Sequence, residues 1–329
     1  MGAITADTVL GMSRGFMECR ILLTGAELNV FGMLASGPMT VSALAERTGA
    51  SVRGLTILLD ALTALRLLDK TGEAYQCPQG VAALLSPNSP DSVLPMVLHT
   101  AGLWGRWSAL TEVVRKGTAE GKPAAFEEEG QLEAFIGAMH VIGRRAAKAF
   151  ADACGAGNAK ALLDVGGASG TYAQAFLESS PGMRATIFDQ PDVIEMARKR
   201  LGAEGLLDRV TLAPGDFYKD ELPGGHDLAL LSAIIHQNSP EQNVALYQKV
   251  FRSLEPGGRL LIRDHVLSAD RTQPPGAAIF AVNMLVATPR GNCYTLAEME
   301  ETLAAAGFTR VRLLQPDERM NGLVEAFRP

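Results

Sequence analysis

The sequence of 329 residues predicts an α/β protein, in which a mostly parallel sheet covered by helices follows a helical amino-terminal domain. Three observations support this fold class. Residues 161–176 read as an apolar strand, a glycine turn and a helix. Strand and helix patterns alternate from there onward, whereas the first third is helical. With 47% apolar residues the chain can bury a sizeable core, and its length favours two domains.

Two helices are predicted near the amino terminus, at residues 39–50 and 51–70, joined at Gly49 and followed by a hairpin-like segment at residues 71–78. This order is typical of a winged helix and raises the hypothesis of a DNA-binding regulator. Between residues 39 and 75, however, four basic side chains are matched by four acidic ones, which leaves no excess positive charge for phosphates. We therefore favour a dimerisation module and expect a homodimer that binds no nucleic acid.

Helices are predicted again between residues 92 and 157, interrupted by a polar loop at residues 116–130. We expect a winged-helix-like dimerisation domain at residues 1–100, linking helices at 101–157 that contribute to a substrate pocket, and a cofactor-binding domain at 158–329. The expected pocket is apolar with some polar contacts, and its residues are Trp104, Phe135, Met139, His140, Asn283 and Met284.

The glycine turn follows a strand that ends at Asp164 and contains Gly166, Gly167 and Gly170. Glycine lets the backbone approach a ligand closely, and the next helix presents free N–H groups. A dinucleotide fingerprint would need glycine at positions 168 and 171, where the chain has alanine and threonine. The spacing instead resembles the acidic-x-Gly-x-Gly-x-Gly loop of S-adenosylmethionine-dependent methyltransferases, with alanine at the middle glycine.

Further strands are predicted in the order that a parallel sheet requires, with helices between them. Their residues are 185–188, 210–212, 228–231 and 260–262, and the runs 311–314 and 323–327 would add an antiparallel pair.

Acidic residues recur where these strands end. Asp189 and Gln190 follow the second strand, and Asp216 and Phe217 follow the third. A carboxylate at the tip of the second strand can bind ribose hydroxyls, and an acid beside an aromatic ring suits adenine. Any one of these acids is also explained as a turn or cap residue. Their recurrence at successive strand ends favours a site for S-adenosylmethionine.

The segment of residues 230–243 extends an apolar strand to His236, and Ser239 and Pro240 then begin a helix. Open α/β sheets bind ligands at the carboxyl ends of their strands. An imidazole at this place can remove a proton near neutral pH. The alternative is a surface histidine on a loop.

The order of motifs resembles that of the plant-type and hydroxyindole-type small-molecule O-methyltransferases. It includes the winged-helix region, DVGGASG, FDQPDVI, GDFY, IIHQNSPEQN and EPGGRLLIRDHV, over nearly the whole chain. The resemblance implies a class I methyltransferase Rossmann-like sheet with a winged-helix dimerisation domain. It implies S-adenosylmethionine as cofactor and S-adenosylhomocysteine as product. The cysteines lack metal-binding spacing, so we expect no metal. It also implies that His236 deprotonates the acceptor hydroxyl and that Ser232 and Arg263 lie near the methionine end of the cofactor.

One position departs from the pattern of this family. The glutamate that often flanks the histidine falls on Cys293, and a neutral thiol cannot orient an imidazole as a carboxylate does. We expect Glu325 to supply the acidic partner.

Three functions stay open at this stage. The leading one is methyl transfer to a hydroxyl of a small phenolic or enolic molecule. The second keeps the cofactor but has a sulfur, nitrogen or carbon acceptor, or has lost methyl transfer. The third is a DNA-binding regulator or a nicotinamide dehydrogenase. A net charge of −6 offers no general basic surface for nucleic acid.

The compartment is predicted from the cysteines and from hydropathy. Four scattered cysteines without metal-binding spacing indicate reduced thiols and a cytoplasmic protein. No apolar run approaches the ~20 residues of a membrane span.

Overall fold

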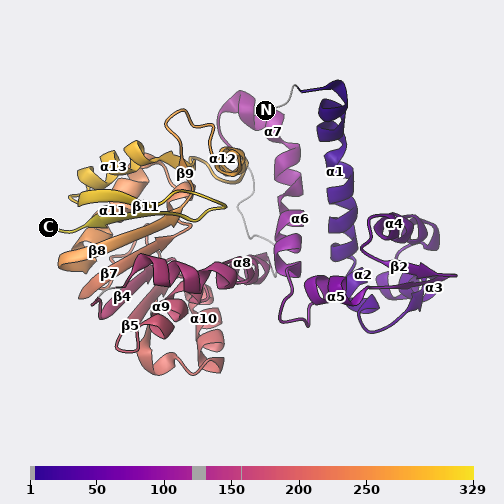
Figure 1. Cartoon of the computed structure of the whole chain (residues 1–329), viewed down its shortest axis with the longest axis horizontal. Helices are drawn as coiled ribbons and strands as arrows, with labels where there is room; N and C mark the ends of the chain where they lie inside the picture. The colour runs from indigo at the N-terminus through magenta and orange to yellow at the C-terminus, as the bar shows by residue number, and fades with distance from the viewer. Residues whose placement is uncertain (1–3, 121–130, 157) are drawn as a thin grey trace. The chain divides into compact units, whose positions relative to one another are not determined.

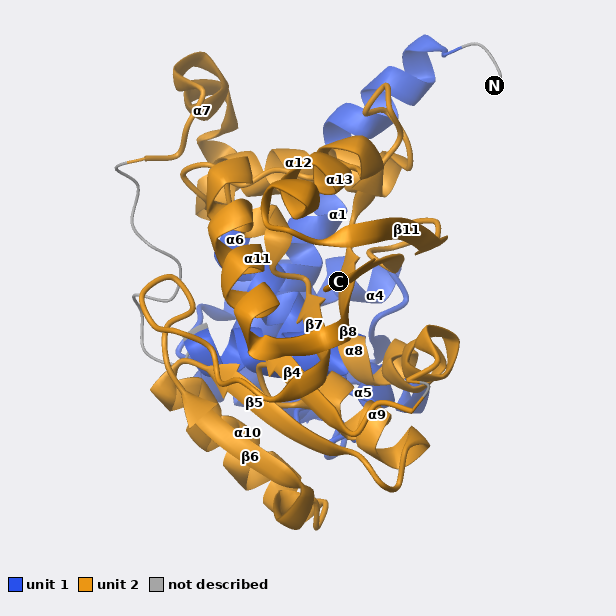
Figure 2. Cartoon of the chain, turned by 90° about the vertical axis from the view of Figure 1, so that its left-hand side faces the viewer, with its two compact units in different colours: residues 1–104, 128–142 blue, residues 105–127, 143–329 orange. Residues whose placement is uncertain are grey.

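The computed structural model describes residues 4–120, 131–156 and 158–329. The chain forms two compact units, which are described separately (Figure 2). Unit 1 comprises residues 1–104 and 128–142, and unit 2 comprises residues 105–127 and 143–329. The boundary expected at residue 100 lies near the end of the first stretch of unit 1. The expected linking segment, residues 101–157, is divided between the two units.

Unit 1 contains a small three-stranded antiparallel sheet in the order β1-β3-β2, together with helices. Its elements are α1 (Ala6–Glu27), α2 (Val30–Leu34), β1 (Met39–Thr40), α3 (Val41–Thr48), α4 (Val52–Ala64), β2 (Asp69–Thr71), β3 (Ala74–Gln76) and α5 (Gln79–Leu85). The two predicted helices and the hairpin are present. The predicted extension of the second helix to residue 70 is wrong, because Arg66 adopts φ +60°, a left-handed conformation that ends the helix.

The core of unit 1 is built on one face of α4. Leu55, Leu59 and Leu62 recur at helical spacing, are fully buried and pack with Phe31 and Tyr75. Burial of each leucine contributes roughly 1.5–3 kcal/mol. These leucines of the second predicted helix therefore belong to the core of this unit.

Helix α1 is buried only toward its carboxyl-terminal end. Its amino-terminal half leaves large apolar side chains exposed within unit 1, and these are Val9, Leu10, Met12, Phe16 and Met17. An apolar surface of this kind usually marks an association site.

Unit 2 is built on a seven-stranded sheet in the order β11-β12-β8-β7-β4-β5-β6. The strands are β4 (Ala161–Val165), β5 (Arg184–Asp189), β6 (Val210–Pro214), β7 (His226–Ser232), β8 (Leu254–Asp264), β11 (Thr309–Gln315) and β12 (Gly322–Phe327). Strands β4 to β8 are parallel, and β12 is antiparallel to both β8 and β11. The predicted strands and the antiparallel closing pair are confirmed.

Helices cover both faces of this sheet (Figure 1). They include α9 (Thr171–Ser179), α10 (Pro191–Ala203), α11 (Pro240–Ser253) and α13 (Leu296–Ala305), with short 3₁₀ turns η1 (Leu207–Arg209) and η2 (Ile235–Gln237). Helix α12 (Pro275–Ala287) packs instead with Leu267 and Cys293. A separate parallel pair joins β9 (Val266–Leu267) to β10 (Tyr294–Thr295). The predicted fold class, a mostly parallel α/β sheet with an amino-terminal helical domain, is confirmed.

The described residues also include α6 (Leu94–Ser108), α7 (Leu110–Lys116) and α8 (Gln131–Cys154). Helix α7 reaches the first residue of the loop predicted at residues 116–130, and residues 121–130 of that loop lie outside the described part. No helix within residues 4–120, 131–156 and 158–329 is both long enough and apolar enough to cross a membrane.

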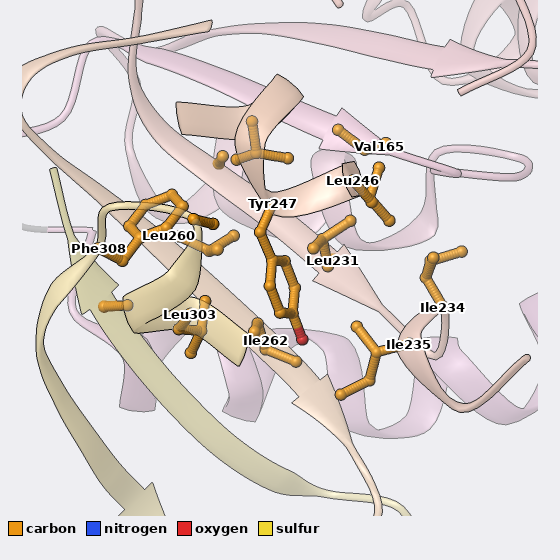
Figure 3. Packing of buried hydrophobic residues seen from close by; sticks show 14 of the residues in the cluster. Val165, Leu231, Ile234, Ile235, Leu246, Tyr247, Leu260, Ile262, Leu303 and Phe308 are labelled. Carbon is orange, nitrogen blue, oxygen red and sulfur yellow. The ribbon is translucent and has the colours of Figure 1, made fainter. Parts of the chain in front are cut away.

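The sheet of unit 2 separates two apolar layers. Leu163, Leu231 and Ile262 face one layer, whereas their sequence neighbours Leu162, Leu230 and Leu261 face the other. Figure 3 shows the first layer, in which the ring of Tyr247 lies among aliphatic side chains of the sheet and of neighbouring helices. This alternation decides to which face each polar residue at the strand ends belongs.

We expect the stability of the protein to fall in mild acid because of His226, a buried residue at the start of β7. Burial lowers the pKa of its imidazole below the usual value, so the unfolded chain binds a proton more readily than the folded one. The stabilising effect of the neutral ring is complete above about pH 6.5 and is lost as pH falls below it.

Urea unfolding of wild type and His226→Gln at about pH 7.5 and about pH 5.5 measures this contribution. The fall in unfolding free energy between the two pH values should be smaller in the variant. An equal fall in both proteins would contradict the prediction.

Candidate active site

His236 lies just beyond the end of β7, in η2. Ala233 has a left-handed φ of +58°, which turns the chain out of the strand. The Nδ1 atom of His236 is 2.8 Å from Oδ1 of Asp264, the last residue of the neighbouring strand β8. Both residues are buried, with 9% of His236 and 1% of Asp264 exposed. Two adjacent parallel strands thus bring an imidazole and a carboxylate together.

The Asp264 carboxylate determines which nitrogen of His236 carries the proton. A carboxylate oxygen accepts hydrogen bonds, so Nδ1–H donates and Nε2 keeps its lone pair. The same Oδ1 atom accepts the backbone N–H of His265 at 2.8 Å. Asp264 therefore fixes both the tautomer and the orientation of the ring, as a base that acts through Nε2 requires.

Further contacts hold His236 from other elements. Its ring meets that of Phe280 on α12 edge to face, with 5.0 Å between centroids. Its carbonyl oxygen accepts the backbone N–H of Asn292 at 2.8 Å. The ring is consequently held on one side by β8 and on another by α12.

The acidic partner predicted for His236 was assigned to the wrong residue. Glu325 lies on β12, is buried and pairs with Arg259 and Arg312 rather than with His236. Its side chain lies on the same face of the sheet as that of Leu323, opposite to the face of Ile262 and Asp264. The contacts of Glu325 are those of a structural ion pair.

Asp264 is the residue that sequence reasoning missed. The signal was available, because the run RLLIRD ends in an acid at Asp264 as the run ATIFD does at Asp189. Cys293 is fully buried, and burial together with the charges of Asp264 and Asp317 raises the pKa of its thiol to about 12. The thiol therefore stays neutral beside the pair.

The glycine loop forms a narrow cradle after β4. Gly166 and Gly170 adopt φ of +67° and +77°, and a Cβ at these positions would lie 2.5 Å from Ile234 Cδ1 and 2.7 Å from Ile187 Cδ1. Larger residues would be strained and would also clash. Gly167 lies between them, and Gly170 is the residue before the first turn of α9. The predicted strand, glycine turn and helix are confirmed.

Asp164 is an unusual carboxylate beneath this loop. Only 1% of it is exposed, and neither oxygen has a hydrogen-bond partner within the described residues. Burial, with a smaller effect from the charge of Asp189, raises its pKa to about 7, although the backbone N–H of Ala173 opposes the shift. A buried acid without a partner is a place where a positively charged ligand group is complementary.

Asp189 ends β5 and is tied to the same loop. Its carboxylate accepts the backbone N–H groups of Ala168 at 2.8 Å and of Gln190 at 2.7 Å. Burial raises its pKa, although these two hydrogen bonds oppose the shift. Gln190 itself precedes the first turn of α10. Asp189 and Gln190 thus join the loop predicted to bind the cofactor.

Asp216 and Phe217 follow β6, as predicted. The Asp216 carboxylate accepts the backbone N–H of Tyr218 at 2.9 Å and pairs with Lys219 at 2.9 Å. Burial raises its pKa, but these contacts outweigh that effect and the net shift is downward. The Phe217 ring lies against Gly166, 3.7 Å from the position of a Cβ there. Phe217 therefore lines the glycine cradle.

Ser232 and Arg263 face each other at the ends of β7 and β8. Arg263 is buried and donates to Ser232 Oγ at 3.4 Å and to Asn321 Oδ1 at 3.0 Å. Its guanidinium lies 5.0 Å from the centre of the Tyr172 ring. Nε of Arg263 is buried without a hydrogen-bond partner within the described residues, and the buried Tyr172 hydroxyl lies beside Ser232. Polar atoms therefore remain available on the face that carries Asp164.

The residues predicted to line a substrate pocket are divided between the units. Asn283 and Met284 lie on α12 in unit 2, on the helix that also carries Phe280. Asn283 Oδ1 accepts the indole N–H of Trp107 at 3.0 Å.

The other four predicted pocket residues belong to unit 1. Trp104 lies under the guanidinium of Arg20, at 5.4 Å from the ring centre, and the Phe135 ring lies 5.2 Å from that of His99. Met139 and His140 are half-buried on α8. Their part in a pocket stays a prediction.

Comparison with known proteins identifies similar sequences and folds. Residues 109–309 match the O-methyltransferase domain, and residues 10–83 match the O-methyltransferase dimerisation domain. The tetracenomycin polyketide synthesis 8-O-methyl transferase TcmO of Streptomyces glaucescens is 31% identical, over 92% of this chain and 91% of its own length. The 3-hydroxy-5-methyl-1-naphthoate 3-O-methyltransferase of Streptomyces sahachiroi is 32% identical, over 92% of this chain and 90% of its own. The structure of human N-acetylserotonin methyltransferase in complex with SAM matches with a TM-score of 0.85 at 27% identity, covering 100% of this chain and 99% of that one.

Proposed function

Because the chain belongs to the O-methyltransferase family, we propose that it methylates a hydroxyl of a small phenolic or enolic molecule, with S-adenosylmethionine as donor and His236 as general base. The observation that supports the base most directly is the buried His236–Asp264 pair at the carboxyl edge of the sheet. The same edge carries the glycine cradle.

The residues present fit the proposed cofactor. Asp164 offers an unpaired buried carboxylate to an ammonium group, and Arg263 offers a buried guanidinium nitrogen to a carboxylate. Asp189 and Gln190 would bind the ribose, and Asp216 and Phe217 the adenine, beside the backbone of Gly166, Gly167 and Gly170. Ser232 would lie at the methionine end with Arg263. When bound, S-adenosylmethionine supplies a methyl group activated by its sulfonium charge.

His236 acts on the acceptor. Its Nε2 atom takes the hydroxyl proton, while Asp264 holds Nδ1–H and stabilises the imidazolium that forms. The rest of the site contributes proximity, because the reaction between two reactants that are bound in line is effectively unimolecular. The protein thus supplies a base and holds the two reactants in position.

The acceptor class follows from α12 and from the relatives. Phe280 and Met284 are apolar, and Asn283 adds an amide beside them on the same helix. This composition suits a flat aromatic molecule with few polar groups. The naphthoate methyltransferase is named for methylation of a hydroxyl group on a naphthoate, and TcmO for 8-O-methylation in tetracenomycin polyketide synthesis. Together these support an aromatic hydroxyl as the acceptor.

We also propose that the protein is a homodimer formed through the dimerisation domain. The exposed apolar side chains of α1 are the surface that a second copy would cover. A cytoplasmic location is proposed on the basis of the four free cysteines.

Replacement of Asp189 by alanine should weaken the binding of S-adenosylhomocysteine by roughly 1.5–3 kcal/mol, the usual value of hydrogen bonds to a charged group. Isothermal titration calorimetry measures the affinity. Asp192→Ala, which removes an exposed carboxylate three residues further along, is the matched control and should bind normally. Unchanged affinity in a folded Asp189→Ala protein would refute the assignment.

Replacement of His236 by alanine should lower turnover roughly 10²–10⁴-fold, the usual contribution of a positioned general base, while cofactor affinity is retained. The assay follows formation of S-adenosylhomocysteine after phenols, thiols and amines have been screened as acceptors. His226→Gln alters the other end of the same strand and should keep full turnover. Equal turnover in His236→Ala would indicate an acceptor that arrives already ionised, such as a thiolate.

Light scattering should show a dimer at micromolar concentration. The double substitution Met12→Asp and Phe16→Asp should convert the dimer to a monomer, because two charges would be buried in the interface. Substitution of the exposed Arg47 by Glu, on α3, is the control and should leave the dimer intact. A monomeric wild type, or tight salt-sensitive binding to duplex DNA, would contradict the proposal.

A further inference from the structure

A second buried histidine–aspartate pair includes His265, the residue directly after Asp264 in the chain. His265 Nδ1 is 2.6 Å from Oδ2 of Asp317, which follows β11. Both residues are buried, and no step of the proposed reaction uses either of them.

We propose that the His265–Asp317 pair positions the catalytic pair, because it fixes Asp264 and, through Asp264, the imidazole of His236. The proposal rests on the role of His236 as general base. His265 and Asp317 are positioning residues that act through other residues.

The first link is a shared oxygen atom. Oδ1 of Asp264 accepts from His236 Nδ1 and also from the backbone N–H of His265, both at 2.8 Å. Any displacement of the His265 backbone therefore moves the hydrogen bond that orients the Asp264 carboxylate. The position of His265 is thus transmitted to His236 through one atom.

The second link is the carboxylate of Asp317. Its Oδ2 atom binds the His265 ring and also lies 3.3 Å from the donating N–H of Val266. The Asp317 carboxylate thereby binds the side chain of His265 and the backbone of Val266, the two residues that follow Asp264. Its Oδ1 atom accepts the N–H of Asn321 at 3.1 Å, which fixes Asp317 to the segment before β12.

Gly322 closes this arrangement from the other side. A Cβ at this position would lie 2.7 Å from the carbonyl oxygen of Asp264 and 3.2 Å from Cβ of Asp317. The start of β12 is therefore packed closely against both residues. Because this region is tightly packed, a small shift of Asp317 would also displace Asp264.

The third link is the ring of Phe280. It lies 4.8 Å from the His265 ring and 5.0 Å from the His236 ring, centre to centre. The two imidazoles thus contact the same aromatic side chain from α12. A rotation of the His265 ring would disturb the surface against which His236 rests.

The Asp317 carboxylate is in its charged form. Burial raises its pKa, but hydrogen bonds from His265, Asn321 and Val266, with the charge of His265, outweigh that effect and lower it. Removal of the charge should therefore loosen several contacts at once.

The test compares Asp317→Asn with wild type in kcat, in KM for S-adenosylmethionine and in the titration of His236 followed by imidazole NMR. We expect kcat to fall roughly 10- to 100-fold, as displacement of a reacting group by about 1 Å can cause, with KM unchanged. The titration midpoint of His236 should shift. His265→Asn keeps a donor near the place of Nδ1 and should retain more activity than His265→Ala.

Asp227→Asn is the matched control. Asp227 also accepts backbone N–H groups, those of Lys160 and Ala161, but it lies at the start of β7. Its substitution should lower stability without changing kcat or the His236 titration. If Asp317→Asn lowers only the melting temperature and leaves kcat and the titration of His236 as in wild type, the pair is structural and the proposal fails.

Failure of the proposed function is distinguishable from failure of this proposal. The titration of His236 needs no turnover, so it reports the coupling even if His236→Ala proves fully active. A shifted titration in Asp317→Asn together with an active His236→Ala protein would refute the base and keep the coupling. A normal titration would refute the coupling alone.

Discussion

Both halves of the site depend on the parallel register between β7 and β8, which places Ser232 opposite Arg263. Side chains alternate between the faces of a sheet, so this register directs Arg263 to the face of Asp164 and Asp264 to the face of His236. A slip of one residue would exchange the two. The proposed cofactor contacts and the proposed base are therefore set by the same hydrogen-bond ladder.

The buried acids of unit 2 differ in what compensates their burial. Asp264 and Asp317 accept hydrogen bonds from imidazoles and backbone, and Glu325 pairs with two arginines. No side chain within the described residues donates to Asp164, and burial raises its pKa despite the opposing effect of the backbone N–H of Ala173. A cationic ligand group bound beside Asp164 would offset the free-energy cost of burying its carboxylate.

Much of the fold was predictable because its signals are local. The strands, the glycine turn and the place of His236 follow from apolar runs, from glycine and from the polar residues after each strand. Glu325 was wrongly assigned because its partners, Arg259 and Arg312, are set by the pairing of β12 with β8 and β11, which no local pattern encodes. Asp264 obeyed the same strand-end rule as Asp189.

The parallel pair β9-β10 is separate from the seven-stranded sheet, and it flanks the segment that contains α12. Substitutions in that segment can change the residues that we propose to contact the acceptor, while the hydrogen bonds of the main sheet stay in place. The glycine cradle and Asp189 would keep their geometry through such changes. Natural substitutions in this part of the chain can therefore change the preferred acceptor with little loss of folding stability. Such an arrangement favours divergence among related enzymes.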